Sequence, residues 1–260
     1  GRGFWILDNV TPLRQEAEAR AAAGAQSAYL FKPATAVRVR FGTNDPTPWP
    51  PELPAGENPL PGAIIDYVLP QNAPQNVKLE ILDNAGKVVR RYASTDPVLD
   101  PHPALDPAAY DKICQRQPGA TDCGLPLYWP APPIRLSTRP GFHRFSWDMR
   151  FEPIGAEEDP VGGDEGATGA VPHRTYPTSF APWAPPGSYQ VRLTVDGKTF
   201  TQPLTLRLDP RVKTPAPALA QLASLSREMY DGAWSAHTAY LQARGLSAQL
   251  DKVSGGGEEV

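Results

Sequence analysis

The chain has 260 residues and a formal net charge of −3, so it is long enough to bury a core as one large domain or two modest ones. The mild acidity gives no electrostatic reason to bind nucleic acid or an anionic membrane surface, and no apolar run approaches the length of a membrane span. The 32 prolines and 22 glycines gather between strand-like runs, which predicts a folded body with long, stiff loops.

The first 31 residues predict a short strand followed by a helical linker. Phe4 to Asp8 is a short apolar run typical of a strand. Pro12 to Gly24 has proline at its start, good helix formers inside and glycine at its end. Because the chain begins with glycine instead of methionine, we expect it to be processed or to be part of a longer protein.

From Gly62 onward, alternating side chains predict seven strands with no helix-length periodic segment between them. An earlier half-buried strand is expected around Val37 and Phe41. We therefore expect a mainly β fold, an antiparallel immunoglobulin-like β-sandwich over residues 32–212. The seven strands are predicted at residues 64–69, 77–81, 88–92, 134–137, 142–147, 189–195 and 200–208.

Two long insertions interrupt the predicted sandwich, at residues 94–133 and 152–186. Loops of this length are normally functional or packed as covers. Cys114 and Cys123 lie in the first insertion and are predicted to form one disulfide, which favours an oxidising compartment, periplasmic or secreted. The alternative is a pair of unlinked thiols in a cytosolic protein. No second cysteine pair is present to complete a zinc site.

The last segment, residues 213–260, predicts one amphipathic helix from about Pro217 to Arg244 and a flexible tail. Gly245 is expected to end the helix. The helix is expected either to fold back on the sandwich or to dock on a partner. Its apolar stripe, with spacings of three and four, excludes Tyr230 and Trp234 and consists of Leu222, Leu225, Met229, Ala233, Ala236 and Tyr240.

The opening of the chain resembles the last strand and exit of the β-propeller in bacterial sortilin-like and Asp-box (sialidase-type) repeat proteins. The body is similar to the region that follows the propeller in that group, and the turn at Pro186 to Tyr189 resembles immunoglobulin-like and fibronectin type III-like modules. That likeness implies that Tyr189 returns its hydroxyl to nearby backbone. The segments that carry the resemblance are GRGFWILDNVTPLRQ, LFKPATAVRVR, LEILDNAGKVVRRY, GFHRFSWDMR and PPGSYQVRLTVDGKTFTQPLTLRLDPRV.

The sialidase-type resemblance implies no active site in this chain, since a propeller's catalytic residues belong to blades that the sequence does not contain. The residues themselves predict no catalytic, cofactor or metal site. Carboxylates gather at residues 157–159 and 164–165, in a glycine-rich loop where a solvated surface or a weak cation site is expected. The four histidines, His102, His143, His173 and His237, are scattered without a ligand or catalytic spacing.

Loop tryptophans are the more informative aromatic residues. Trp49, Trp129 and Trp183 each lie among prolines, where they can plug a loop onto the sandwich, anchor a protein partner or stack on a sugar. With Trp234 of the helix, they are the candidate partner or sugar contacts.

Taken together, these features predict a non-catalytic extracytoplasmic interaction or structural module, an accessory part of a larger assembly that can lie at a membrane surface. Two alternatives stay open. One is a fragment of a sialidase-type glycoside hydrolase whose active site lies elsewhere, and the other is a carbohydrate-binding module that uses the loop tryptophans.

Overall fold

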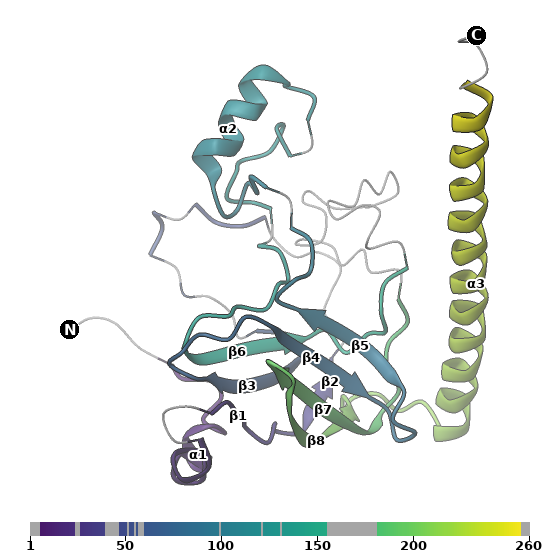
Figure 1. Ribbon diagram of the computed structural model, residues 1–260. Helices are drawn as coiled ribbons and strands as arrows, with labels where there is room; N and C mark the ends of the chain where they lie inside the picture. The colour runs from purple at the N-terminus through teal and green to yellow at the C-terminus, as the bar shows by residue number, and fades with distance from the viewer. Residues whose placement is uncertain are drawn as a thin grey trace.

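The fold is built from two β-sheets in a computed structural model that describes residues 6–23, 27–39, 47–50, 52–54, 56, 60–98, 100–120, 122–130, 132–154 and 181–255. Within these residues, one sheet has three strands in the order β1-β3-β6 and the other has five in the order β2-β8-β7-β4-β5 (Figure 1). The three-stranded sheet contains β1 (Tyr29–Leu30), β3 (Ala63–Leu69) and β6 (Gly141–Trp147), and the five-stranded sheet contains β2 (Ala36–Arg38), β4 (Val77–Leu82), β5 (Val88–Ala93), β7 (Gly187–Val195) and β8 (Lys198–Leu208).

The two sheets share one hydrophobic core, as in a β-sandwich. The inward side chains alternate along the strands as the sequence pattern predicts, for example Leu204 and Leu206 in β8. Aromatic rings contact each other across the layers, with Trp147 at 5.8 Å from Tyr189. Packing inward faces against each other removes apolar surface from water, and this burial is the main favourable term in folding. The mainly β fold class is therefore confirmed.

One strand pair departs from the antiparallel prediction. β2 runs parallel to β8, with Val37 opposite Arg207. The strand also presents the other face to the core, because Ala36 is buried whereas Val37 is exposed. The predicted inward set was therefore wrong at Val37, and Phe41 lies outside the described residues. A strand of three residues has too few side chains for its alternation to decide which face is buried.

Two further predicted strands do not form as expected. Residues 134–137 have no strand pairing, and only Leu136 among them is buried. The two prolines before this segment have no backbone N–H to donate to a sheet, and the backbone N–H of Arg135 donates a 3.0 Å hydrogen bond to the nearby carbonyl of Pro133. The side chain of Arg135 donates through Nε to the carbonyl of Ser94 at 2.8 Å. In the predicted strand at residues 4–8, positions 4 and 5 lie outside the described residues, whereas 6–8 form no strand and are exposed.

The predicted N-terminal helix is present as a 3-10 turn, η1 (Leu13–Gln15), followed by α1 (Glu16–Ala23). Gln15 joins this helical segment to the body through its side-chain amide. The amide nitrogen donates to the carbonyl of Lys32, and the amide oxygen accepts from the N–H of Lys32, both at 2.9 Å. This pair fixes the helical segment beside the chain that leaves β1.

A helix that the sequence analysis did not anticipate, α2 (Pro107–Arg116), lies in the first insertion. It stands away from the two sheets (Figure 1). Asp106 caps its start by accepting a 3.0 Å hydrogen bond from the N–H of Ala109, and proline occupies the first position of the helix. Aspartate followed by proline is a recognised helix start, so this signal was present in the sequence.

The C-terminal segment forms one long helix, α3 (Ala216–Gly255), which stands beside the sheets (Figure 1). The helix continues through Gly245, so the predicted end there was wrong. A glycine inside a helix costs only about 1 kcal/mol relative to alanine, and the good helix formers that follow it sustain the helix. Among the helices described, none combines the length and the apolar character needed to cross a membrane.

Candidate functional site

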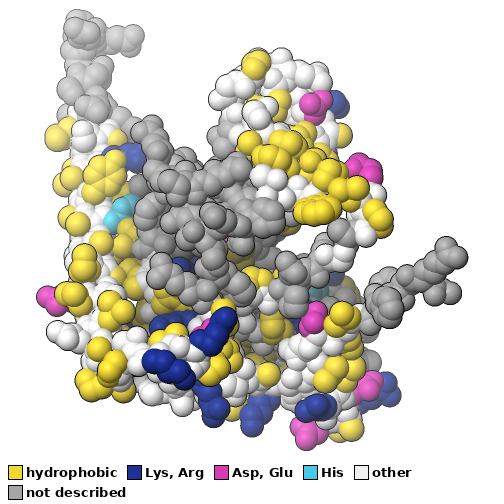
Figure 2. All heavy atoms as spheres, turned by 180° about the vertical axis from the view of Figure 1, so that it is seen from behind, with side chains coloured by type: hydrophobic (Ala, Val, Ile, Leu, Met, Phe, Trp, Pro, Cys, Tyr) yellow, Lys and Arg dark blue, Asp and Glu magenta, His cyan; other side chains and the backbone are white. Residues whose placement is uncertain are grey.

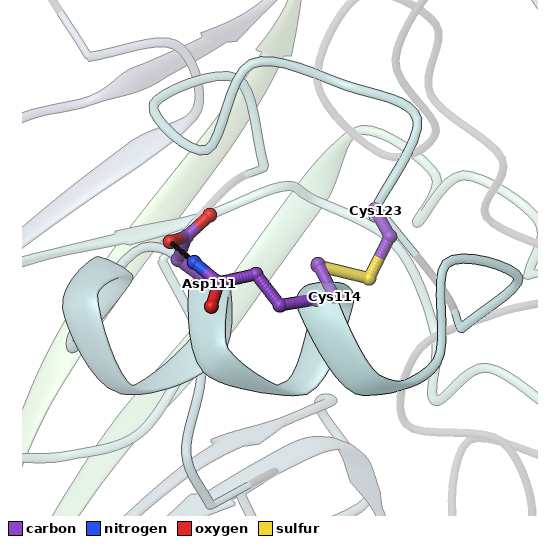
Figure 3. Close-up of a disulfide and its surroundings, with 4 residues drawn as sticks. Asp111, Cys114 and Cys123 are labelled. Atoms are coloured by element: carbon purple, nitrogen blue, oxygen red, sulfur yellow. Dashed lines mark hydrogen bonds between the residues drawn. A yellow bond between two sulfur atoms is a disulfide. The ribbon is translucent and has the colours of Figure 1, made fainter.

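The predicted disulfide is present and closes the end of α2 onto the turn that follows it. Cys114 lies in the last turn of α2, and its Cα atom is 5.2 Å from that of Cys123 (Figure 3). One turn earlier, Asp111 accepts a 2.6 Å hydrogen bond from the side-chain amide of Gln115. The covalent link therefore stiffens a projection of the molecule, and neither cysteine belongs to the core between the sheets.

Trp183 is held by two arginines and packs against the core. The guanidinium of Arg38 lies 5.5 Å from the centre of its ring and that of Arg150 lies 4.5 Å from it. These cations also bind the chain on either side of the tryptophan, since Arg38 donates to the carbonyl of Ala184 at 2.8 Å and Arg150 to that of Ala181 at 2.9 Å. Trp183 therefore plugs its loop onto the sandwich.

The other three candidate tryptophans lie in different segments and environments. Trp49 is 64% exposed. Trp129 is half-buried in the insertion that contains α2, where its ring lies edge-on to that of Tyr128. Trp234 lies on α3, and its ring centre is 6.1 Å from that of Tyr230. The rings of Trp183 and Trp234 thus have other side chains as partners, and the role of the four tryptophans as partner or sugar contacts stays a prediction.

The candidate acidic loop, residues 157–165, and His173 lie outside the described residues. His102 accepts a 3.0 Å hydrogen bond from the N–H of Ala104 through Nδ1, and burial lowers its pKa although Asp122 opposes this. His143 stacks on the ring of Tyr67 at 5.1 Å. Across the described part of the chain, no three His, Cys, Asp or Glu side chains are grouped to hold a metal ion.

Two buried carboxylates form ion pairs on the sheet surfaces that point away from the core. Asp66 in β3 accepts a 2.8 Å hydrogen bond from Nε of Arg144 in β6. Glu80 in β4 accepts a 2.8 Å bond from Nε of Arg192 and lies 3.2 Å from the ammonium of Lys78. Burial alone raises the pKa of Glu80, but these two cationic donors outweigh burial and hold the pKa below its ordinary value. Both carboxylates have structural partners.

One face of α3 docks on the body around Phe151, which follows β6. The ring of Tyr230 lies 5.7 Å from that of Phe151, and the guanidinium of Arg227 lies over the same ring at 4.7 Å. The hydroxyl of Tyr230 donates a 2.7 Å hydrogen bond to the carbonyl of Glu152. Burial raises the pKa of Tyr230, and the charge of Glu152 adds to this, so the hydroxyl stays protonated as a donor.

The predicted apolar stripe of α3 does not make this contact. Four large side chains of the stripe, Leu222, Leu225, Met229 and Tyr240, are between 54% and 69% exposed, and so are Leu246 and Leu250, which lie beyond the predicted stripe. Figure 2 shows hydrophobic side chains along the length of α3, the tall column at the left of that view. The stripe therefore forms an unburied apolar face, and Tyr230, which the sequence analysis placed off the stripe, is the residue that packs against the core.

The site that the structure presents most clearly is thus the exposed apolar face of α3. The sequence identified the stripe but missed the docking by Tyr230, because no local pattern links that residue to Phe151, far away along the chain. Comparison with protein-family models, curated proteins and solved structures finds no match to this chain.

Proposed function

We propose that this chain is a non-catalytic interaction module, an accessory subunit or domain of a larger assembly outside the cytoplasm. The observation that carries the proposal is the exposed apolar face of α3. Folded proteins rarely expose a contiguous apolar patch of this kind unless it binds a partner or a membrane. Here the patch lies on a helix whose other face is held by Phe151 and Glu152.

We further propose that the sandwich is immunoglobulin-like. In support, the two sheets have the orders β1-β3-β6 and β2-β8-β7-β4-β5, and a tyrosine sits at the corner where β7 begins. Tyr189 donates a 2.6 Å hydrogen bond to the carbonyl of Pro185, four residues earlier. Such a tyrosine corner recurs in immunoglobulin-like sandwiches. Burial raises the pKa of Tyr189 to about 12, so the donor proton is retained at neutral pH.

The proposed compartment is the periplasm or the exterior of the cell. The disulfide between Cys114 and Cys123 supports this, because disulfides persist in oxidising compartments and are rare in the cytosol. Its direct test is the redox state of both cysteines in protein extracted from its native source with a thiol-blocking reagent.

The experiment that tests the interaction function uses two matched variants of α3. Ala236→Glu places a charge in the centre of the exposed apolar face, and Ala248→Glu places the same charge about three turns further along the helix, off that face. Both chains are used as bait in native extract, with chemical cross-linking and mass spectrometry of bound protein. We expect the wild type and Ala248→Glu to retain a partner that Ala236→Glu loses. Identical capture by all three chains would contradict the proposal.

The absence of catalysis is part of the proposal and has its own test. We expect the purified chain to give no turnover on a broad panel of glycosides and peptides. Turnover that survives further purification and co-elutes with the chain would overturn the proposed absence of catalysis. The capture experiment would still decide the role of α3.

A further inference from the structure

The exposed apolar face of α3 has a regular spacing over most of the helix. Four residues of the stripe seen in the sequence belong to a longer set of nine, which follow one another at alternating intervals of three and four and none of which is charged or polar. They are Leu222, Leu225, Met229, Gly232, Ala236, Ala239, Ala243, Leu246 and Leu250. All nine are exposed. An average period of 3.5 sustained over four heptads is the pattern by which one helix packs along another.

A helix with this pattern gains stability from packing, because isolated helices depend on burial of an apolar face. The docked face of α3 carries Tyr230 and Arg227, both of which the body partly covers. The nine residues point away from that contact, since side chains on one helix face recur every three or four residues. The helix therefore presents a second, unoccupied packing surface, which we call the outer face.

Along the outer face, large and small side chains follow one another in nearly the same order from either end of the helix. Bulky residues occupy both ends, Leu222 to Met229 and Leu246 to Leu250, and only glycine and alanine lie between them. The one unequal pair is Met229 with Ala243. Two helices that cross are closest at the crossing point and diverge away from it. Small residues at the centre permit the close approach, and large ones fill the widening gap toward each end.

We infer that the outer face binds a second copy of this chain, with the two α3 helices antiparallel and crossing near Ala236. This inference rests on the proposed function, for which it names the partner. A two-fold axis brings each residue of such a pair opposite its counterpart from the other end of the helix. Only an antiparallel pair needs side-chain sizes that follow the same order from both ends of the helix. In a parallel pair each residue lies beside the same residue of the other copy, whatever the order of sizes.

The buried area agrees with this pairing, and the pairing places no like charges side by side. Of the positions that flank the outer face, only Glu228 is charged, and antiparallel pairing puts it beside the glutamine-containing second half of the partner helix, near Gln242 and Gln249. The ten Leu and Met side chains of two copies expose on the order of 1,000 Å², which is the most that they can bury. Together with the small residues and Tyr240, the total comes near the roughly 1,200 Å² at which stable interfaces begin.

The test measures the mass of the full-length chain in solution by light scattering and sedimentation, up to about 100 μM, where a micromolar dissociation constant gives mostly dimer. We expect the wild type to be a dimer and Ala236→Glu to be a monomer. Ala248→Glu, which carries the same charge off the outer face, is expected to remain a dimer.

A second pair of variants separates loss of the dimer from loss of the helix. A side chain added at Gly232 or Gly245 meets open space in one copy, and leucine favours the helix over glycine at both positions. Gly232→Leu is expected to weaken the dimer about tenfold or more, equivalent to at least 1.4 kcal/mol, because it adds bulk near the crossing point. Gly245→Leu, off the outer face, is expected to leave it unchanged.

Orientation is tested with single cysteines. Met229→Cys and Ala243→Cys are expected to cross-link to each other when the two variants are mixed, and Met229→Cys alone is expected not to link to itself. Self-linking of Met229→Cys would overturn the antiparallel arrangement.

The result for the wild type also separates this inference from the proposed function. A monomer at every concentration would overturn the inference. If that monomer still captured a different protein through a contact that Ala236→Glu abolishes, the interaction function would stand with another partner. A monomer without such a contact would refute both.

Discussion

The hydroxyl of Tyr230 in α3 donates a 2.7 Å hydrogen bond to the backbone carbonyl of Glu152, which follows the last strand of the three-stranded sheet. The ring that carries this hydroxyl also packs on Phe151. These contacts decide which face of α3 turns toward the sheets and which is left for a partner. The docking contact can therefore be tested separately from the outer face.

Replacing Tyr230 by phenylalanine keeps the ring contact with Phe151 and removes the donor to Glu152. We expect the docked helix to lose about 1 kcal/mol, the usual net contribution of one hydrogen bond, and amide exchange in the first half of α3 to become faster. Tyr240→Phe removes a hydroxyl from an exposed tyrosine of the same helix. If the two variants exchanged alike, the bond to Glu152 would contribute nothing to docking.

Tyr189→Phe tests the corner at the start of β7. The hydroxyl of Tyr189 is the donor to Pro185, and the ring is buried in the core. Loss of the bond leaves a carbonyl without that donor, so we expect global unfolding to become easier by about 1–2 kcal/mol. Urea denaturation measures this. Unlike Tyr230→Phe, the change should affect the whole sandwich, and a change confined to local exchange near residue 189 would contradict it.

Glu80 should make stability depend on pH. Because its pKa is held below the ordinary value in the folded chain, its contribution is fully present above the unfolded pKa of about 4.3. That contribution is lost as the pH falls through the lower folded value. We expect Glu80→Gln to be less stable than wild type at pH 7 and the difference to shrink below about pH 4.

Urea denaturation at several pH values checks this prediction. Glu16→Gln serves as the control, since it removes an exposed carboxylate from α1. A difference between Glu80→Gln and wild type that stayed constant from pH 7 to about pH 3 would contradict the assignment.

The disulfide should stabilise its own projection more than the sandwich. Closing a loop of about ten residues contributes about 2–3 kcal/mol in the chain-entropy model, and Cys114 and Cys123 lie outside the shared core. We expect the double change to serine to make residues 107–123 sensitive to protease while the far-ultraviolet spectrum of the sheets persists. Simultaneous loss of both signals would show that the projection and the sandwich unfold as one unit.

The sequence alone was sufficient for the features that depend on local pattern. Alternation between residues 62 and 208 marked six of the seven predicted strands, and the sheet-forming segments around Leu79, Val191 and Leu204 lie in the core as expected. The short separation of the two cysteines indicated their pairing, and the spacing of apolar residues identified the long C-terminal helix. Each of these signals lies within one continuous short segment of the chain.

Only the tertiary structure decided how these elements meet. Val37 is exposed because β2 joins β8 as a short parallel edge strand, and residues 134–137 form no strand although their composition favours one. The most consequential case is α3, where the sequence marks the face with the most apolar side chains. The folded chain instead turns the side that carries Tyr230 toward the core, because Phe151 and the carbonyl of Glu152 offer a ring and an acceptor at that place. Contacts between residues about 80 positions apart leave no periodic trace in the sequence. The local pattern was therefore enough to predict that the helix forms, whereas the tertiary contacts determined which side of the helix faces the sheets.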